Sequence, residues 1–296
     1  MAKESKWKRI EDLIARLATG GCACISLLAL GLIAAFLLRE GASIFASVSP
    51  GALLGGREWF PTSEPPSFGL LPMIAGSALV TAGALALAVP LGIAVAIFVA
   101  EVAPTYLRDP LKVVVEILAG IPSVVYGFFG LLILSPWLQG MLGLPTGQTA
   151  LTASLILGIM ALPTVASITE DAIVAVPDTW REASLALGAT RWQTILGVVL
   201  PAAKSGLSAA IVLGLGRAVG ETMAVLMVSG NSPLLPPSPL RPVRTLTATL
   251  ALEMAEAVVG SPHYHALFAA GGVLFLFTLA LKLAGELVGR RVRRGR

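Results

Sequence analysis

One arginine and one glutamate lie a helical turn apart inside an apolar stretch, and they are the first candidates for chemistry. The stretch 206–228 is long enough to cross a bilayer, and Arg217 lies near its middle, four residues before Glu221. A charge at that depth costs at least about 2.5–3.5 kcal/mol, so both side chains must face protein, water or a partner. Two interpretations stay open. In the first, the two residues form an ion pair that helps helices pack. In the second, they line an anion path in which Arg217 is the counter-charge and Thr222 lies alongside. Glu221 would then orient Arg217 or accept a hydrogen bond from a protonated oxyanion.

Two hydroxyl side chains next to prolines extend this candidate path. Ser123 follows Pro122 in one apolar stretch, and Thr164 follows Pro163 in the next. Proline removes a backbone donor and frees a carbonyl, and in a membrane that irregularity persists only where neighbours or water satisfy the backbone. Each site is either a plain kink or a pore-lining break, and the hydroxyls favour the break. At Pro90 we expect a plain kink.

A polar, helix-forming insert interrupts the apolar sequence. Thr179 and Glu182 have the spacing of a capping box, in which each side chain bonds to the other residue's backbone N–H. Gly188 suits the left-handed turn that ends a helix, and Thr190 with Gln193 has the spacing of a second capping box. The pattern predicts helix, glycine turn, helix. Such an insert is either an ordinary loop or a surface that a protein outside the membrane can bind.

Small residues recur on the stretch that carries Arg217. They form one ladder at four-residue spacing and a GxxxG pair beside it, namely Gly206, Ala210 and Gly214, then Gly216 and Gly220. Ridges of this kind let membrane helices approach closely. We expect this surface to pack against another helix, within the chain or across an interface between subunits.

Composition restricts the class of protein. Of the 296 residues, 56% are hydrophobic and 13% charged, whereas soluble domains have about a quarter charged. The formal charge of +4 does not indicate nucleic-acid binding, because the basic residues cluster at the ends of apolar stretches. The spacing of His263 and His265 is a poor metal signal, and Cys22 and Cys24 are expected to be thiols buried in lipid or protein. The sequence has neither a phosphate-binding glycine loop nor a metal-ligand cluster, so any ATP and Mg²⁺ are expected on another chain.

The apolar stretches predict an all-α, polytopic membrane protein with six transmembrane helices. A cytoplasmic segment 1–16 precedes the first helix, 17–38, and an extracytoplasmic loop, 39–69, in which Trp59 and Phe60 are expected at the membrane interface. The core, 70–287, carries five more spans at about 70–100, 113–134, 150–169, 206–228 and 266–287, with a cytoplasmic insert at 170–204 and an extracytoplasmic loop at 231–261. A basic cytoplasmic tail, 288–296, ends the chain.

The distribution of basic residues orients these spans. The two termini, the 101–112 turn and the 170–204 insert carry most Lys and Arg, whereas the opposite set of loops carries only Arg39, Arg57, Arg241 and Arg244. The positive-inside rule therefore predicts that both termini and the insert are cytoplasmic.

Several motifs resemble those of known transport proteins. Glu182-Ala183-Ser184, Gly188 and the Leu200-Pro201 end resemble the coupling loop of ABC importer permeases, which docks on an ATP-binding subunit. Three further stretches resemble the phosphate-specific transport (Pst) permeases, and the third of them is similar to the PstC type: Phe68-Gly69-Leu70-Leu71-Pro72, Gly120-Ile121-Pro122-Ser123-Val124-Val125-Tyr126-Gly127, and Gly216-Arg217-Ala218-Val219-Gly220-Glu221-Thr222-Met223-Ala224-Val225.

The resemblance implies a type I ABC importer permease fold in a bacterial or archaeal cell (inner) membrane. It implies a non-enzymatic subunit that pairs with a second, PstA-like permease, two ATP-binding subunits and an extracytoplasmic phosphate-binding protein. Alternatives are a permease for sulfate or molybdate, the PstA-type sister subunit and, from another class, an ion-coupled secondary anion carrier. A secondary carrier has no need of the insert around Glu182.

Overall fold

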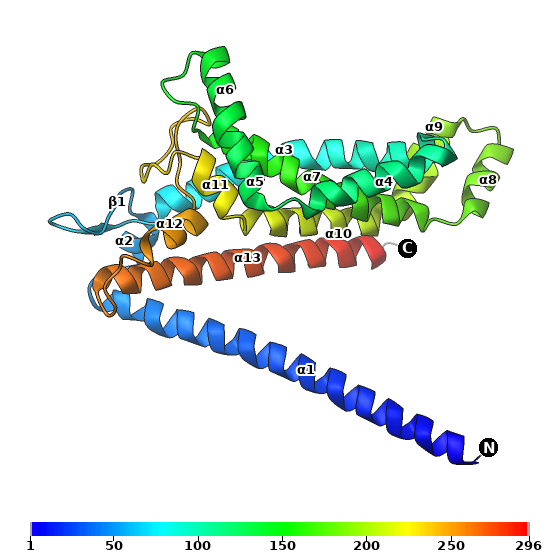
Figure 1. The fold of residues 1–296 in the computed structure, drawn as a ribbon, viewed down its shortest axis with the longest axis horizontal. Coiled ribbons are helices and arrows are strands. Elements are labelled where there is room, and N and C mark those ends of the chain that lie inside the picture. The colour runs from blue at the N-terminus through cyan, green and yellow to red at the C-terminus, as the bar shows by residue number, and fades with distance from the viewer. Residues whose placement is uncertain (1, 295–296) are drawn as a thin grey trace.

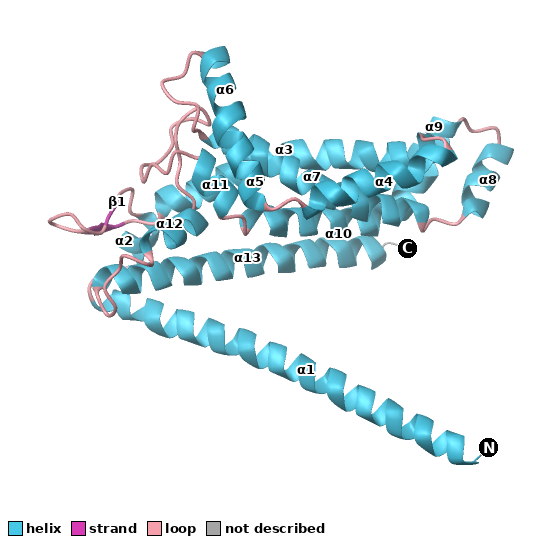
Figure 2. Cartoon of the chain, viewed as in Figure 1, coloured by secondary structure: helices cyan, strands magenta, loops and turns pink. Residues whose placement is uncertain are grey.

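The computed structural model describes residues 2–294, and the side chains of residues 12–287 within them. The fold is almost entirely helical, with one two-stranded hairpin (Figure 2). The elements in order are α1 Ala2–Ala42, η1 Ser43–Ala46, α2 Pro50–Gly55, β1 Trp59–Phe60, β2 Ser67–Phe68, α3 Leu71–Ile97, η2 Phe98–Val102, α4 Thr105–Gly120, α5 Ser123–Phe129, η3 Gly130–Leu134, α6 Ser135–Leu142, α7 Ala150–Val174, α8 Asp178–Ala186, α9 Arg191–Thr194, η4 Ile195–Val199, α10 Leu200–Val219, α11 Met223–Val228, α12 Leu246–Glu253 and α13 Pro262–Arg294.

Helices α3, α7 and α10 pack side by side and form the core (Figure 1). Small residues allow the close approach. A Cβ added at Gly214 would lie 2.6 Å from Val165 Cγ2 of α7, and one at Gly206 would collide with Ala172 Cβ. Ala210 between them is fully buried. The packing role predicted for this ladder is therefore confirmed, with α7 of the same chain as the neighbour.

The GxxxG pair beside the ladder is not a tight helix contact. A Cβ added at Gly216 would meet only Lys282 of α13, at 3.8 Å, and one at Gly220 would meet only its own helix. These two glycines make no close helix contact within this chain, because α13 leaves a cavity of about 180 Å³ beside Gly216. Packing across an interface between subunits stays a prediction for them.

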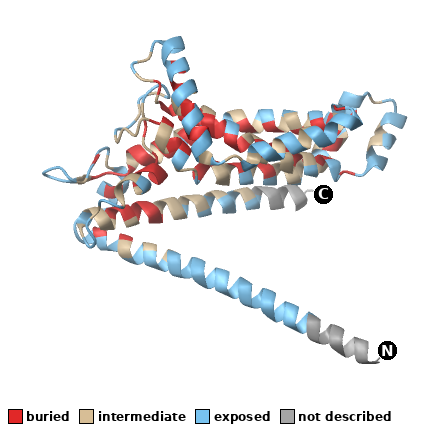
Figure 3. Cartoon of the chain, viewed as in Figure 1, coloured by how far each residue is buried: buried red, intermediate tan, exposed pale blue. Residues whose placement is uncertain are grey.

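Among the residues whose side chains the structure describes, helix α1 contacts the rest of the chain near its C-terminal end. There it runs against the start of α13, where Gly41 lies so close to Ala269 that an added Cβ would be 2.9 Å from its Cα. Towards the N-terminus α1 diverges from α13 (Figure 1), and the side chains of residues 12–33 are exposed within this chain (Figure 3). Cys22 and Cys24 are free thiols on this exposed part.

Six helical segments are long and apolar enough to span a membrane, as predicted. The insert helices α8 and α9 lie at the same end of the molecule as the N-terminal end of α1 and the C-terminal end of α13. Elements α2, β1 and α12 lie at the opposite end (Figure 1). We call these the cytoplasmic end and the extracytoplasmic end, following the charge distribution. Helix α1 extends through the predicted 1–16 segment from Ala2, and α13 through the predicted tail as far as Arg294; residues 1, 295 and 296 lie outside the described residues.

Two predicted spans are displaced. The third breaks after Gly120, because Pro122 lacks an N–H and restricts Ile121 to an extended backbone, so the apolar segment is Ser123–Leu142 and not 113–134. The fifth begins at Arg191 and ends at Val219. Pro201 does not end a helix, since the π-helical segment η4 precedes it and the chain continues directly into α10.

Pro90 and Pro163 lie inside uninterrupted helices. The gating break expected beside Thr164 is therefore absent from α7. This helix is held between α3 and α10 along its length, and that packing keeps it continuous despite the lost backbone bond.

The extracytoplasmic segments are more ordered than loops. The 39–69 segment folds into η1, α2 and the hairpin, in which Trp59 pairs with Phe68. Trp59 is only 1% exposed and packs edge-on against Phe68, so its predicted place at the membrane interface was wrong. The indole ring is buried in the interior of this small subdomain and therefore does not lie in the lipid interface.

A cluster around Glu253 joins these extracytoplasmic segments. One carboxylate oxygen accepts from Trp59 Nε1 at 2.8 Å and contacts His263 Nε2 at 2.9 Å, and the other accepts from Arg244 Nη1 at 2.6 Å. Arg244 Nε also donates to the Asn231 carbonyl at 2.9 Å. One carboxylate therefore joins β1, which is 194 residues away in sequence, to the segments just before and just after α12.

Replacing this carboxylate should destabilise the extracytoplasmic end. In Glu253→Gln, Arg244 loses its charge partner, and a hydrogen bond to a charged group contributes about 1.5–3 kcal/mol. We expect a Tm several degrees lower in detergent, measured by thermal unfolding. The matched control is Glu256→Gln on an exposed side chain, which should leave the Tm unchanged. Equal Tm values for the two variants would contradict the role assigned to Glu253.

Candidate functional site

Two broken helices meet beside Arg217. Helix α4 ends at Gly120 and α5 starts at Ser123, while α10 ends at Val219 and α11 starts at Met223. The pieces α5 and α11 pack tightly, since a Cβ added at Gly127 would lie 3.0 Å from Ala224 Cα. Both interruptions therefore occur in one region of the protein.

This region lies about halfway across the protein. Gly214 contacts Val165, the sixteenth residue of the 25-residue helix α7. Three residues further along α10, Arg217 is about 4.5 Å nearer the extracytoplasmic end, hence about 18 Å along a helix about 37 Å long. Arg217 therefore lies level with the middle of α7, and its place at the membrane midplane stays a prediction.

The guanidinium of Arg217 is held by a backbone carbonyl. Its Nη2 donates to Ala119 O, at the C-terminal end of α4, over 3.4 Å. Its Nε is buried and has no hydrogen-bond partner in the described part of the chain. Guanidinium has five N–H donors, so most of its bonding capacity stays unused in this conformation.

The predicted ion pair between Arg217 and Glu221 does not form among the described residues, and that interpretation was wrong. Because α10 ends at Val219, Glu221 does not continue the helical face that carries Arg217. Instead Glu221 Oε1 accepts from Ala224 N at 3.1 Å and caps the start of α11. The Glu221 carbonyl accepts from Thr247 Oγ1 at 2.9 Å.

The other predicted path residues lie around the breaks without bonding to Arg217 in the described structure. Ser123 is half-buried at the start of α5, and Thr164 is half-buried on unbroken α7. Thr222 and Gly220 line an open cavity of about 610 Å³ that α12 and α13 complete. The structure therefore places Thr222 beside an accessible space.

Sequence reasoning missed the groups that complete the midplane region. Pro122 cannot donate to the carbonyl of Leu118, four residues earlier, and the Tyr126 hydroxyl donates to that carbonyl at 2.9 Å instead. Arg217 donates to the next carbonyl along the chain, that of Ala119. The proline was a sufficient signal that carbonyls would be freed, but not of which side chains would reach them.

At the cytoplasmic end the insert folds as helix, turn, helix, as predicted. Gly188 has a φ of +86°, in the left-handed region that favours glycine, and Thr190 and Gln193 form the second capping box. The first box is absent: Thr179 lies inside α8, which starts at Asp178 after Pro177, so its hydroxyl is no longer at the capping position.

Arg181 attaches this insert to the spans. Its guanidinium donates twice to Glu101 Oε1, at 2.8 and 3.0 Å, and also to the carbonyls of Ile173 and Val176 at the end of α7. The side chains of Arg181 and Glu101 are only 18% and 13% exposed. Sequence reasoning missed this pair, because the two residues are 80 positions apart.

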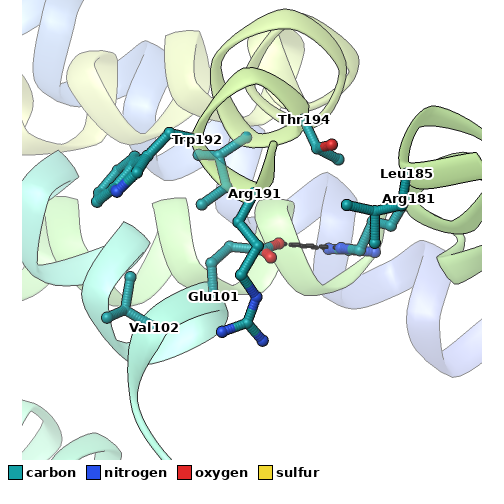
Figure 4. Close-up of a pocket in the computed structure, with 8 residues that line it drawn as sticks. Glu101, Val102, Arg181, Leu185, Arg191, Trp192 and Thr194 are labelled. Carbon is teal, nitrogen blue, oxygen red and sulfur yellow. Dashed lines mark hydrogen bonds and ion pairs between the residues drawn. The ribbon is translucent and has the colours of Figure 1, made fainter. Parts of the chain in front are cut away.

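This ion pair lines a cavity of about 210 Å³ (Figure 4). Arg191 and Trp192 from α9 line it, together with Val102 from the end of the second span. Ser184 Oγ and Thr194 Oγ1, 2.9 Å apart, join α8 to the start of the long fifth span. The insert therefore contacts the second, fourth and fifth membrane spans through specific polar bonds.

Its outward surface combines exposed polar and apolar groups. Glu182 and Ala183 are exposed, and Leu187 at the turn is 89% exposed. Large exposed apolar side chains beside polar ones mark surfaces that bind other proteins. Leu200 and Pro201, also predicted here, belong instead to the start of α10.

A second ion-pair cluster joins α4 to the cytoplasmic end of α7. Lys112 Nζ lies 2.7 Å from Glu170 Oε2 and 2.8 Å from Asp171 Oδ1. The hydrogen bonds to Asp171 and Glu170 raise the pKa of Lys112 well above its usual range. The lysine therefore stays charged at physiological pH.

Comparison with known proteins assigns this architecture. Residues 88–294 match the family described as binding-protein-dependent transport system inner membrane component. The chain belongs to this family. It is therefore a multi-pass inner-membrane component of a transport system, and the family decides against the ion-coupled secondary carrier.

The similarity to relatives of this inner-membrane component extends over most of both chains. A probable ABC transporter permease protein, YqgH of Bacillus subtilis, is 42% identical over 93% of this chain and 91% of its own. The phosphate transport system permease protein PstC of Mesorhizobium japonicum is 38% identical over 92% and 88%.

Solved structures of ABC transporters share the fold. A chain of a bacterial alginate ABC transporter superposes with a TM-score of 0.66 over 95% of this chain and 97% of its own, at 15% identity. A chain of the inward-facing MetNI methionine ABC transporter has a TM-score of 0.58 over 75% and 97%, at 20% identity. The all-α importer permease fold is confirmed.

Removing the guanidinium of Arg181 should loosen the insert of this permease. In Arg181→Ala, α8 loses its bonds to Glu101 and to the end of α7. We expect faster backbone hydrogen exchange across 177–187, measured by mass spectrometry. Arg191→Ala, on an exposed side chain lining the same cavity, is the control and should exchange as the wild type does. Unchanged exchange in Arg181→Ala would show that α8 is held by other contacts.

Proposed function

We propose that this chain is the PstC-type permease of an ATP-driven phosphate importer. A second, PstA-like permease completes the translocation path, and an extracytoplasmic phosphate-binding protein delivers the anion. The observation that carries the proposal is Arg217, a cation with unused donors at mid-depth between two broken helices. The phosphate-transport names of several relatives support the choice of anion.

Arg217 suits an oxyanion by charge and by shape. Guanidinium presents planar paired donors that match phosphate bidentately. Its long bond to the Ala119 carbonyl is a weak one that an anion can replace. Phosphate would thereby exchange part of its water shell for fixed donors at the depth where the bilayer barrier is highest.

ATP binding and hydrolysis, with Mg²⁺, are assigned to two partner subunits that bind the insert. The exposed Glu182, Ala183 and Leu187 form the surface presented to them. Movement of α8 would pass through Arg181 to Glu101 and the end of α7, and through Ser184 to Thr194. Three spans, the second, fourth and fifth, would therefore respond together.

Sulfate and molybdate present similar oxygens to a guanidinium, so Arg217 alone does not select among oxyanions. Selection is assigned to the binding protein. The relatives named PstC favour the PstC type over its PstA-type sister.

Loss of the guanidinium should abolish phosphate uptake. In cells that lack their own high-affinity system and express the partner proteins, Arg217→Ala should lower the uptake rate at least about ten-fold, because a hydrogen bond to a charged group contributes about 1.5–3 kcal/mol. Arg217→Lys, which keeps the charge and loses the fork, should be intermediate. Lys282→Ala, an exposed cation on α13, is the control. Normal uptake by membrane-inserted Arg217→Ala would refute the anion path.

The turn at Gly188 should control binding of the ATPase. A side chain with a β-branch is strained at φ +86°, at a cost of about 1–2 kcal/mol, whereas Asn tolerates this region. Gly188→Val should lose most of the co-purifying ATPase, and Gly188→Asn should keep it. Since a Cβ there meets no neighbour within this chain, equal retention by both variants would mean that the turn is not the docking element.

A further inference from the structure

Helix α12 lies in the segment 231–261, which the sequence places outside the membrane, yet its first turn is buried among the spans. Leu246, Thr247, Ala248 and Thr249 are all buried, and the helix packs on α3 and α13. Thr245 caps its start by accepting from Ala248 N at 3.2 Å. Regular helix with satisfied backbone ends is what allows this segment to enter the interior.

The inner end of α12 is bonded to the break beside Arg217. Thr247 Oγ1 donates to the Glu221 carbonyl at 2.9 Å, and Glu221 caps α11 through its side chain. Leu246 N donates to Ser77 Oγ of α3 at 3.0 Å. The position of α12 therefore fixes the backbone between α10 and α11.

The outer end of α12 is bonded to the extracytoplasmic surface. Glu253, its last residue, holds Trp59 from β1, Arg244 and His263 from the start of α13. Thr247 and Glu253 are six residues apart, about 9 Å along a helix. One rigid turn and a half of helix therefore joins the outer surface to the midplane break.

We propose that α12 transmits docking on the extracytoplasmic surface to the Arg217 break, and that Thr247 is the positioning residue that makes the connection. The proposal rests on the proposed function, because it takes the extracytoplasmic binding protein as the docking partner. Packed helices shift as units between discrete arrangements, so a displacement at Glu253 reaches the Glu221 carbonyl with little loss. Arg217 lies two residues before the end of α10, so this movement would release its guanidinium from the Ala119 carbonyl and present it to the anion.

The test compares two isosteric substitutions on α12 in the complete reconstituted complex. Thr247→Val removes the bond to the Glu221 carbonyl. Thr249→Val removes an equally buried hydroxyl that bonds only within α12, to the Thr245 carbonyl, and is the control. The readout is the ratio of ATPase activity with the phosphate-loaded binding protein to activity without it.

We expect Thr247→Val to lower this ratio about five-fold or more, the usual range of coupling between sites, while basal activity and assembly of the complex stay near wild type. Thr247→Ser should restore the ratio, and Thr249→Val should keep it. Trp59→Phe, which removes a bond at the outer end, should lower the ratio too, and the double variant with Thr247→Val should be no worse than Thr247→Val alone.

Each outcome is decisive. A wild-type ratio in Thr247→Val, or multiplying effects in the double variant, would overturn the transmission role of α12 and leave the phosphate importer intact. A wild-type complex that phosphate-loaded binding protein does not stimulate would instead overturn the proposed function on which it rests. Loss of basal activity in Thr247→Val without rescue by Thr247→Ser would show a structural role only and would also refute the proposal.

Discussion

Every helix that stops inside a bilayer must find partners for the backbone groups it frees, and this protein depends on how it meets that requirement at Pro122. The carbonyls of Leu118 and Ala119 lose their helical donors there, and Tyr126 and Arg217 replace them. The arginine is thus held by a backbone dipole and not by a carboxylate. Its charge remains available at a depth where an unbalanced charge is costly, and that is the physical basis of the anion path we propose.

The charged groups at the two ends of the molecule are arranged differently. Arg181 at the cytoplasmic end and Glu253 at the extracytoplasmic end each have several short hydrogen bonds, to one partner distant in sequence and to others nearby. Such saturated clusters hold segments together as rigid units. The sparse bonding of Arg217 between them is what the proposed exchange of the Ala119 carbonyl for an anion requires.

The core of α3, α7 and α10 supplies the fixed frame for these groups. Glycines at the helix contacts bring the backbones close, and α7 stays continuous through Pro163 because both flanks are packed. Against this frame the short pieces α5, α11 and α12 meet near the midplane. Short packed pieces can move as units, whereas a continuous span could not rearrange locally without breaking its own backbone bonds.

The sequence alone determined the features that depend on local composition. Apolar length predicted six spans, charge asymmetry their orientation, and the turn at Gly188 followed from the residue that tolerates its backbone best. The ladder from Gly206 to Gly214 was recognisable from its spacing, and the motifs around Glu182 and Arg217 were sufficient to indicate the family.

Only the tertiary structure decided which groups meet. The sequence suggested that Arg217 pairs with Glu221, since four residues make one helical turn, but a helix that ends at Val219 removes that geometry. It also suggested a break at Pro163, which packing suppresses, and a place for Trp59 at the membrane interface, whereas the structure buries this side chain inside the protein. The bonds from Arg181 to Glu101 and from Thr247 to Glu221 join segments far apart in the chain. Periodicity describes one segment at a time, whereas such contacts depend on how all the segments pack, so no local pattern could have specified them.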